Sequence, residues 1–154
     1  MDIFTKNAAR LDGLDQLRAF LANGGQAPMT QTLGIALVEI DAGRAVFEGD
    51  PDASVYNPIG TVHGGYAATL LDSACGCAVH SRLSPDQGYA TLELKISYHW
   101  PVSETSGRVR AEGTLLSIGR RAAFAQAQLT DEQGRLCASA TSTLLVFDRK
   151  PEAD

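Results

Sequence analysis

The stretch YNPIGTVHGGYAATLLDSACGCAVHSRL, residues Tyr56–Leu83, decides the fold because it turns from a loop into one long apolar helix. Asn-Pro and Gly mark the loop, and the apolar run that follows has helical length. Between His63 and Arg82, Asp72 is the only acidic residue. An isolated carboxylate is costly in an apolar helix, so Asp72 is either paired with a structural partner or used chemically.

Length and composition are those of one ordinary globular domain. The 154 residues are 44% hydrophobic and 20% charged, with a formal net charge of −5. This charge argues against a nucleic-acid-binding protein, which needs a basic surface. No stretch approaches the roughly 20 apolar residues of a membrane span, and the N-terminal pattern is not that of a signal peptide. We therefore expect a cytoplasmic protein with no membrane partner.

The cysteines predict neither a disulfide framework nor a metal site. Cys75, Cys77 and Cys137 are an odd number in a chain without an export signal. On a helix Cys75 and Cys77 would point about 200° apart, so they cannot share a metal ion. Small buried side chains are the better interpretation.

The rest of the chain predicts a single α+β domain over residues 1–154. An amphipathic helix is expected from about Thr5 to Ala22, and Asn23–Gly25 ends it, so residues 1–25 form an N-terminal helix and turn. TLGIALVEI and AVFEG, separated by DAGR, predict a β-hairpin. From Tyr89 onward, four alternating segments separated by turn-rich stretches predict long antiparallel strands.

About six strands and one long helix predict an antiparallel sheet wrapped around a central helix. One helix can cover one face of such a sheet only if the sheet curls around it. The edges and much of the far face then still need a partner. We therefore expect an oligomer.

The two glycines of HGGY stand where the long helix begins. A helix N-terminus offers unpaired backbone N–H groups and a positive dipole end, both suited to an oxygen that gains negative charge. Gly64 and Gly65 have no Cβ, so a ligand carbonyl can approach the backbone closely. This is the geometry of an oxyanion hole, although paired glycines before a helix also occur as a plain tight turn.

Asp72 and Gly65 lie too far apart to act on one carbonyl within one chain. Asp72 comes seven residues after Gly65, which is about 10.5 Å along a helix. A nucleophile and an oxyanion donor must both lie within a few ångströms of the carbonyl they act on. If both residues are catalytic, two antiparallel helices of a two-fold dimer supply one each.

From about Thr32 to Phe147 the chain resembles the PaaI-type hotdog-fold acyl-CoA thioesterases. The resemblance rests on NPIGTVHGGYAATLLD followed by four antiparallel strands. It implies a hotdog core over residues 32–147. The implied assembly is at least a homodimer, and a homotetramer where two dimers pair, as they usually do in this family. It also implies hydrolysis of an acyl-CoA with an aromatic or medium-length acyl group. Coenzyme A is then part of the substrate, and no cofactor or metal is expected.

The resemblance also implies residue roles. Asp72 would attack the thioester carbonyl or activate a water, and the Gly65 N–H of the other subunit would polarise the carbonyl oxygen. His63 would orient the loop, Asn57 would help place the carbonyl or the water, and Thr91 would hold the hydrolytic water. Each of these last three has a structural alternative: a helix cap, a turn before proline and an ordinary strand residue.

Two further sets of residues are candidates for substrate binding. Arg120 and Arg121, in a predicted turn, have planar donors that suit the phosphates of coenzyme A, and a solvated turn is the alternative. We expect the acyl group near the helix start and the dimer seam. The expected lining there is Tyr66, Leu70 and the loop residues Val55 and Ile59, and Gly64 is expected to bind the substrate through its backbone.

Two other functions stay open at this point. A hydratase or dehydratase acting on a 2-enoyl thioester would need a histidine working with an acid, and the HGG start with a mid-helix Asp72 suits hydrolysis better. A non-catalytic acyl-CoA-binding protein has no need of a carboxylate at Asp72. The residue types also allow both direct attack by Asp72 and base-assisted attack by water.

Overall fold

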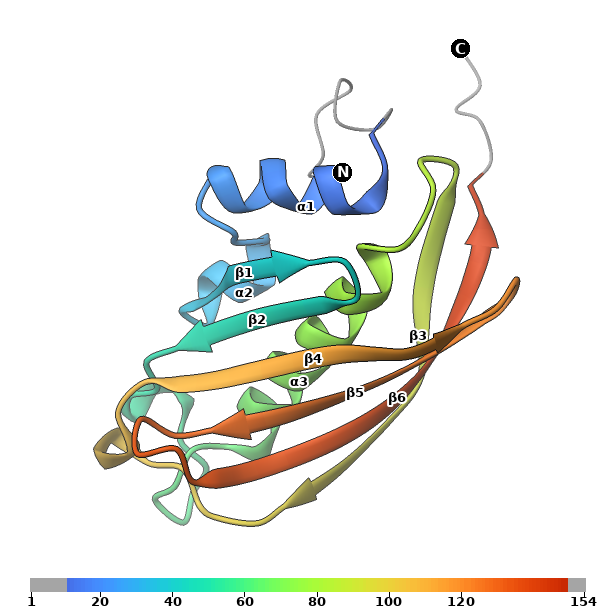
Figure 1. Cartoon of the computed structure of the whole chain (residues 1–154). Coiled ribbons are helices and arrows are strands. Elements are labelled where there is room, and N and C mark those ends of the chain that lie inside the picture. The colour runs from blue at the N-terminus through green and yellow to red at the C-terminus, as the bar shows by residue number, and fades with distance from the viewer. Residues whose placement is uncertain (1–10, 150–154) are drawn as a thin grey trace.

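The computed structural model describes residues 11–149, which form an α+β domain with one six-stranded antiparallel sheet (Figure 1). Its helices are α1 (Gly13–Ala22), α2 (Pro28–Thr32) and α3 (Gly64–His80). The strands are β1 (Ile35–Asp41), β2 (Arg44–Gly49), β3 (Gln87–Tyr98), β4 (Val109–Ile118), β5 (Ala122–Thr130) and β6 (Leu136–Asp148). They pair in the order β1-β2-β4-β5-β6-β3. The predicted hairpin, long helix and four late strands are confirmed.

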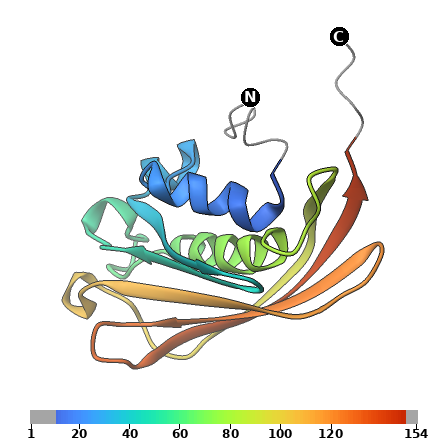
Figure 2. The same cartoon turned by 45° about the horizontal axis from the view of Figure 1, so that its top comes forward.

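The sheet curls around α3, as Figures 1 and 2 show, with α3 on the concave side. Alternation in β4 explains which face turns inward: Val109, Ala111 and Gly113 are buried, and the residues between them are not. At Gly113 a Cβ would collide with the carbonyl of Ala74 in α3. Glycine there lets the strand lie directly against the helix backbone.

Helix α1 lies across the open side of the curled sheet (Figure 2). It begins at Gly13, after Asp12, whose carboxylate accepts a hydrogen bond from the Asp15 N–H at 3.0 Å. A helix from Thr5 was predicted. Its part up to residue 10 falls outside the described residues, and residues 11 and 12 are not helical, because Asp12 is the N-cap. The predicted end at Asn23–Gly25 is confirmed.

Short helix α2 was not predicted from the sequence. It begins with Pro28, which suits a first helical turn, and the Thr30 hydroxyl accepts a hydrogen bond from the Ala27 N–H at 2.9 Å. The segment therefore carries its own start signals, but five residues are too few to show helical periodicity. Helix α1 packs against β1 and α3, and α2 packs against β1.

Strand β3 is one edge of the sheet, since it pairs only with β6 among the described strands. Large apolar side chains remain accessible on it: Leu92 is 62% and Tyr98 57% exposed. An edge strand with unpaired backbone groups and exposed apolar side chains is suited to pairing with another chain. The expected oligomer stays a prediction, and β3 is where we expect it to form.

Candidate active site

His63 caps the N-terminus of α3. Its Nδ1 accepts a hydrogen bond from the Gly65 N–H at 2.8 Å, and its backbone N–H donates to the Val55 carbonyl at 2.8 Å. The predicted capping geometry is therefore present, and it ties the loop to the helix start. It also means that the Gly65 N–H already has an acceptor in the single chain. A ligand oxygen at this position would share that N–H with the His63 ring or displace the ring.

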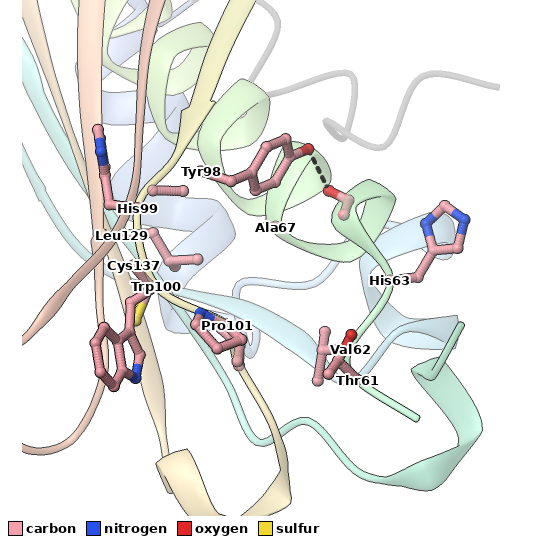
Figure 3. Close-up of a pocket in the computed structure, with 13 residues that line it drawn as sticks. Thr61, Val62, His63, Ala67, Tyr98, His99, Trp100, Pro101, Leu129 and Cys137 are labelled. Carbon is pink, nitrogen blue, oxygen red and sulfur yellow. Dashed lines mark hydrogen bonds between the residues drawn. The ribbon is translucent and has the colours of Figure 1, made fainter. Parts of the chain in front are cut away.

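Tyr98, at the end of β3, closes the same helix start from the other side. Its hydroxyl donates to the Gly64 carbonyl at 2.8 Å (Figure 3). A Cβ on Gly64 would lie 3.0 Å from that hydroxyl oxygen, so the glycine makes room for the ring. Sequence reasoning missed Tyr98, because alternation marks it as a strand residue and nothing in the pattern marks its hydroxyl.

A cavity of about 360 Å³ opens beside this helix start (Figure 3). Trp100 stands in its wall, half exposed, with the guanidinium carbon of Arg135 5.0 Å from the centre of its ring. Arg135 is in turn held by the buried carboxylate of Asp131 at 2.7 Å. The lining residues are Thr61, Val62, His63, Gly64, Ala67, Tyr98, His99, Trp100, Pro101, Val102, Leu129, Cys137 and Ala138.

Asp72 and Thr91 meet where α3 faces β3. The Thr91 hydroxyl donates to Asp72 Oδ1 at 3.0 Å, so the structure brings together two of the residues that the sequence singled out. Asp72 is half-buried in the single chain, because it lies on the side of α3 that faces the edge strand rather than the sheet interior. It accepts this hydrogen bond from a hydroxyl group. The structural alternatives were an ion pair with an arginine and a hydrogen bond from a backbone amide.

The cysteines of α3 point to different sides of the helix, as predicted. Cys75 is fully buried in the core and Cys77 is partly buried. Burial first, and the charge of Asp72 second, raise the pKa of each thiol to about 12. Both thiols are therefore neutral at physiological pH, which suits small packing side chains. Among residues 11–149, no three His, Cys, Asp or Glu side chains gather closely enough to hold a metal ion.

Asn57 uses its side-chain hydrogen bonds within its own loop. Its Oδ1 accepts from the N–H groups of Ile59 and Thr61 at 3.1 and 3.2 Å, and its Nδ2 donates to the Thr61 hydroxyl at 2.9 Å. This is the turn chemistry that an Asn before a proline favours. The contact with a carbonyl or a water stays a prediction.

The remaining candidates are two arginines in a turn of the sheet and a tyrosine in the first turn of α3. Arg120 and Arg121 are exposed in the turn between β4 and β5, where the Arg121 carbonyl accepts from the Val146 N–H at 3.0 Å. Tyr66 is 4% exposed and packs in the core with the fully buried Leu70. Burial, followed by the nearby acidic charges, raises the pKa of Tyr66 to about 12. The phosphate-binding role and the acyl-pocket lining therefore stay predictions.

No helix within residues 11–149 is both long and apolar enough to cross a membrane.

Comparisons with known proteins place this arrangement in a family. A family model described as "Thioesterase superfamily" matches residues 59–138, more than half of the chain. The proofreading thioesterase EntH of Klebsiella pneumoniae is 33% identical over 119 residues, which are 77% of this chain and 85% of that protein. A 1,4-dihydroxy-2-naphthoyl-CoA hydrolase of Listeria monocytogenes is 26% identical over 122 residues, 79% of this chain and 98% of that protein.

A solved structure agrees with the sequence relatives. A variant of the phenylacetic acid degradation protein PaaI from Thermus thermophilus superposes with a TM-score of 0.70 at 29% identity, covering 77% of this chain and 98% of that chain. The predicted resemblance to PaaI-type proteins, and with it the hotdog architecture of a sheet wrapped around one long helix, is confirmed. The chain belongs to the thioesterase superfamily and is a thioesterase.

Proposed function

We propose that this thioesterase hydrolyses acyl-CoA thioesters with an aromatic or medium-length acyl group, releasing a carboxylic acid and free coenzyme A. The observation that carries the proposal is the hydrogen bond between Thr91 and the half-buried Asp72, beside the edge strand. A carboxylate held by a hydroxyl group is oriented for nucleophilic or general-base work. The printed name of the Listeria relative, a naphthoyl-CoA hydrolase, supports an aromatic acyl-CoA.

Asp72 acts on the thioester in one of two ways. As a nucleophile, its oxygen bonds to the thioester carbon and expels the coenzyme A thiolate, and water then hydrolyses the acyl–Asp72 anhydride. As a general base, it takes a proton from a water that attacks the same carbon, and the thiolate leaves with a proton. In both, the Thr91 hydroxyl oxygen, which donates to Asp72, can accept a hydrogen bond from the water.

We propose a site shared by two subunits, because one chain cannot bring its own Gly65 to its own Asp72. Two hydrogen bonds tie β3 to α3, one from Thr91 to Asp72 and one from Tyr98 to Gly64. If two β3 edges pair antiparallel about a two-fold axis between Leu94 and Lys95, Thr91 lies opposite the partner's Tyr98. That register carries the helix start of one subunit towards Asp72 of the other.

In this arrangement the partner's Gly65 N–H polarises the carbonyl, and His63 yields or shares its hydrogen bond. A fixed backbone donor stabilises the transition-state charge on an oxyanion more than it stabilises a neutral ring nitrogen. Asn57 then acts by holding the loop that carries His63. A homodimer is the smallest active unit, and a homotetramer is the assembly expected from the resemblance. No cofactor is required by these steps.

The test measures free-thiol release from a panel of aromatic and straight-chain acyl-CoAs by the wild type and Asp72→Asn. The amide can still accept from Thr91, so folding and assembly are retained while nucleophile and base are lost. We expect turnover of at least one substrate by the wild type and a fall in kcat of about 10²–10⁴-fold in the variant. Asp86→Asn, which removes an exposed carboxylate in a turn, is the charge-matched control and stays active.

Two outcomes would contradict the proposal. Full activity in Asp72→Asn would make the carboxylate structural. A wild type that binds coenzyme A tightly but turns over none of the panel would be a binding protein instead. A single turnover in ¹⁸O-water then distinguishes the two chemical routes. If water attacks the Asp72 carbon of an anhydride, the label enters Asp72 and the first product lacks it.

A further inference from the structure

A second cavity, of about 400 Å³, lies along the later half of α3 and beneath α1 and α2. Aromatic rings from four elements dominate its wall: Phe20, Phe47, Tyr89 and Phe147. Its polar groups are three hydroxyls, the Cys77 thiol, the His80 imidazole and the Arg149 guanidinium. The other lining residues are Leu17, Ala27, Thr30, Ser73, Cys77, His80 and Gly88.

This cavity begins next to Asp72. Ser73, the residue after it, lines the wall, and Cys77 lines it one helical turn further on. On the strand side, Tyr89 lies two residues before Thr91 and so on the same face of β3. The Tyr89 ring packs against α3 at Gly76, where a Cβ would come within 2.6 Å of the Tyr89 hydroxyl oxygen. The Asp72–Thr91 pair therefore stands at the rim.

The negative charge of Asp72 contributes to the pKa shifts of two groups that line the cavity. Burial and then Asp72 raise the pKa of Cys77, and burial, Cys77 and Asp72 together raise the pKa of Tyr89. Both groups stay neutral near pH 7, so they add no charge to the wall beside the carboxylate. Such a wall favours a neutral hydrocarbon or aromatic group over a charged one.

The cavity at the helix start is also lined largely by apolar side chains, but its polar groups are different. It holds the His63 and Gly64 groups, His99 and an exposed Trp100 under Arg135. Polar and cationic groups of this kind suit a polar chain that continues to the protein surface. Tyr66 and Leu70, expected from the sequence to line the acyl pocket, are closed into the core.

We infer that the acyl group of the thioester enters the cavity beneath α1 and α2, and that Phe20, Cys77 and Tyr89 determine which acyl groups fit. The inference rests on the proposed hydrolysis at Asp72. It assigns the N-terminal helices a function, since Leu17 and Phe20 of α1 and Thr30 of α2 form the outer wall. The substrate class is a neutral aromatic or medium-length acyl thioester that ends within this cavity.

The first experiment compares kcat/KM for acetyl-, hexanoyl-, octanoyl-, benzoyl- and phenylacetyl-CoA in two variants. Cys77→Phe fills the cavity, and we expect the larger acyl groups to lose about 10–100-fold relative to acetyl-CoA. Phe20→Ala enlarges it, and we expect preference to move about tenfold towards the longer chain. Leu14→Ala, on the same helix and packed on the core without lining this cavity, is the matched control.

A uniform change across all acyl groups, or the same selectivity shift in Leu14→Ala, would overturn the inference. Should Cys77→Phe fail to fold, Phe20→Ala decides the question alone, because truncation leaves the backbone of α1 unchanged. Absence of all turnover in the wild type would instead contradict the proposed function, so the two failures differ.

A second readout needs no catalysis. In Asp72→Asn, bound phenylacetyl-CoA should protect Cys77 from alkylation by N-ethylmaleimide at pH 9, detected by peptide mass spectrometry, and desulfo-coenzyme A, which has no thiol to consume the reagent, should not. Cys75 and Cys137, which are 0% and 1% exposed, serve as internal references. Equal protection by phenylacetyl-CoA and desulfo-coenzyme A would place the acyl group elsewhere.

Discussion

The two ends of α3 differ in what they present to a ligand. At the first turn, the Gly65 N–H bonded to the His63 ring and the Gly64 carbonyl bonded to Tyr98 lie beside an open cavity. Along its later half, the helix instead presents Ser73 and Cys77 to a largely apolar cavity covered by α1 and α2. Asp72 lies between the two.

This difference follows from helix geometry. Backbone N–H groups without a hydrogen-bond partner inside the helix exist only in the first turn. In later turns the backbone groups bond to one another, so only side chains can contact a ligand. A helix that supplies both donor and carboxylate must therefore separate them along its axis. In the proposed shared site, this separation is the reason why one chain is insufficient: the donor end and the carboxylate of the same helix would serve different thioesters.

The largest loss of activity is expected when the N–H donor in the first turn of α3 is removed. Gly65→Pro removes the N–H, and proline is tolerated in a first helical turn. Loss of one oxyanion donor should lower kcat by about 10²–10³-fold. Gly65→Ala keeps the N–H and adds a Cβ 3.0 Å from His63 Nδ1, so it should lose much less. Steady-state kinetics with the best acyl-CoA measures both, and equal losses would assign the effect to shape rather than to the donor.

Mixed oligomers test whether the two ends of one helix serve different sites. We expect Asp72→Asn and Gly65→Pro to be inactive alone and to regain activity when co-assembled, because one of the two sites in a mixed dimer is intact. Random pairing should restore about a quarter of wild-type activity. Mixing Asp72→Asn with Asp72→Ala is the control and restores none. No recovery in the first mixture would mean that each chain builds its own site.

The smallest effect is expected at the hydroxyl that holds the carboxylate. Thr91→Val keeps the branched shape but removes the hydrogen bond to Asp72, which is worth about 1 kcal/mol or roughly a fivefold loss in kcat. Thr91→Ser retains the hydroxyl and should keep most of the activity. Thermal unfolding checks that neither variant has lost stability. Unchanged kcat in Thr91→Val would reduce Thr91 to an ordinary strand residue.

Much of the site could be predicted because its residues are close together in the sequence. His63, Gly65 and Asp72 fall within ten residues, so helical rise and the chemistry of helix starts suffice to relate them. Thr91 required the resemblance, since a threonine in a strand is common by itself. The role of Tyr98 was not predicted, because its contact with Gly64 joins residues 34 positions apart.

The sequence by itself determined the element types, the curl of a sheet around one helix and the separation of Gly65 from Asp72. Local periodicity, turn residues and helical rise carry that information along the chain. Only the tertiary structure decided that Tyr98 meets Gly64, that Tyr66 is closed into the core, and that α1 and α2 cover a largely apolar cavity beside Asp72. These features depend on which distant segments pack against one another, and a local sequence pattern does not contain that information.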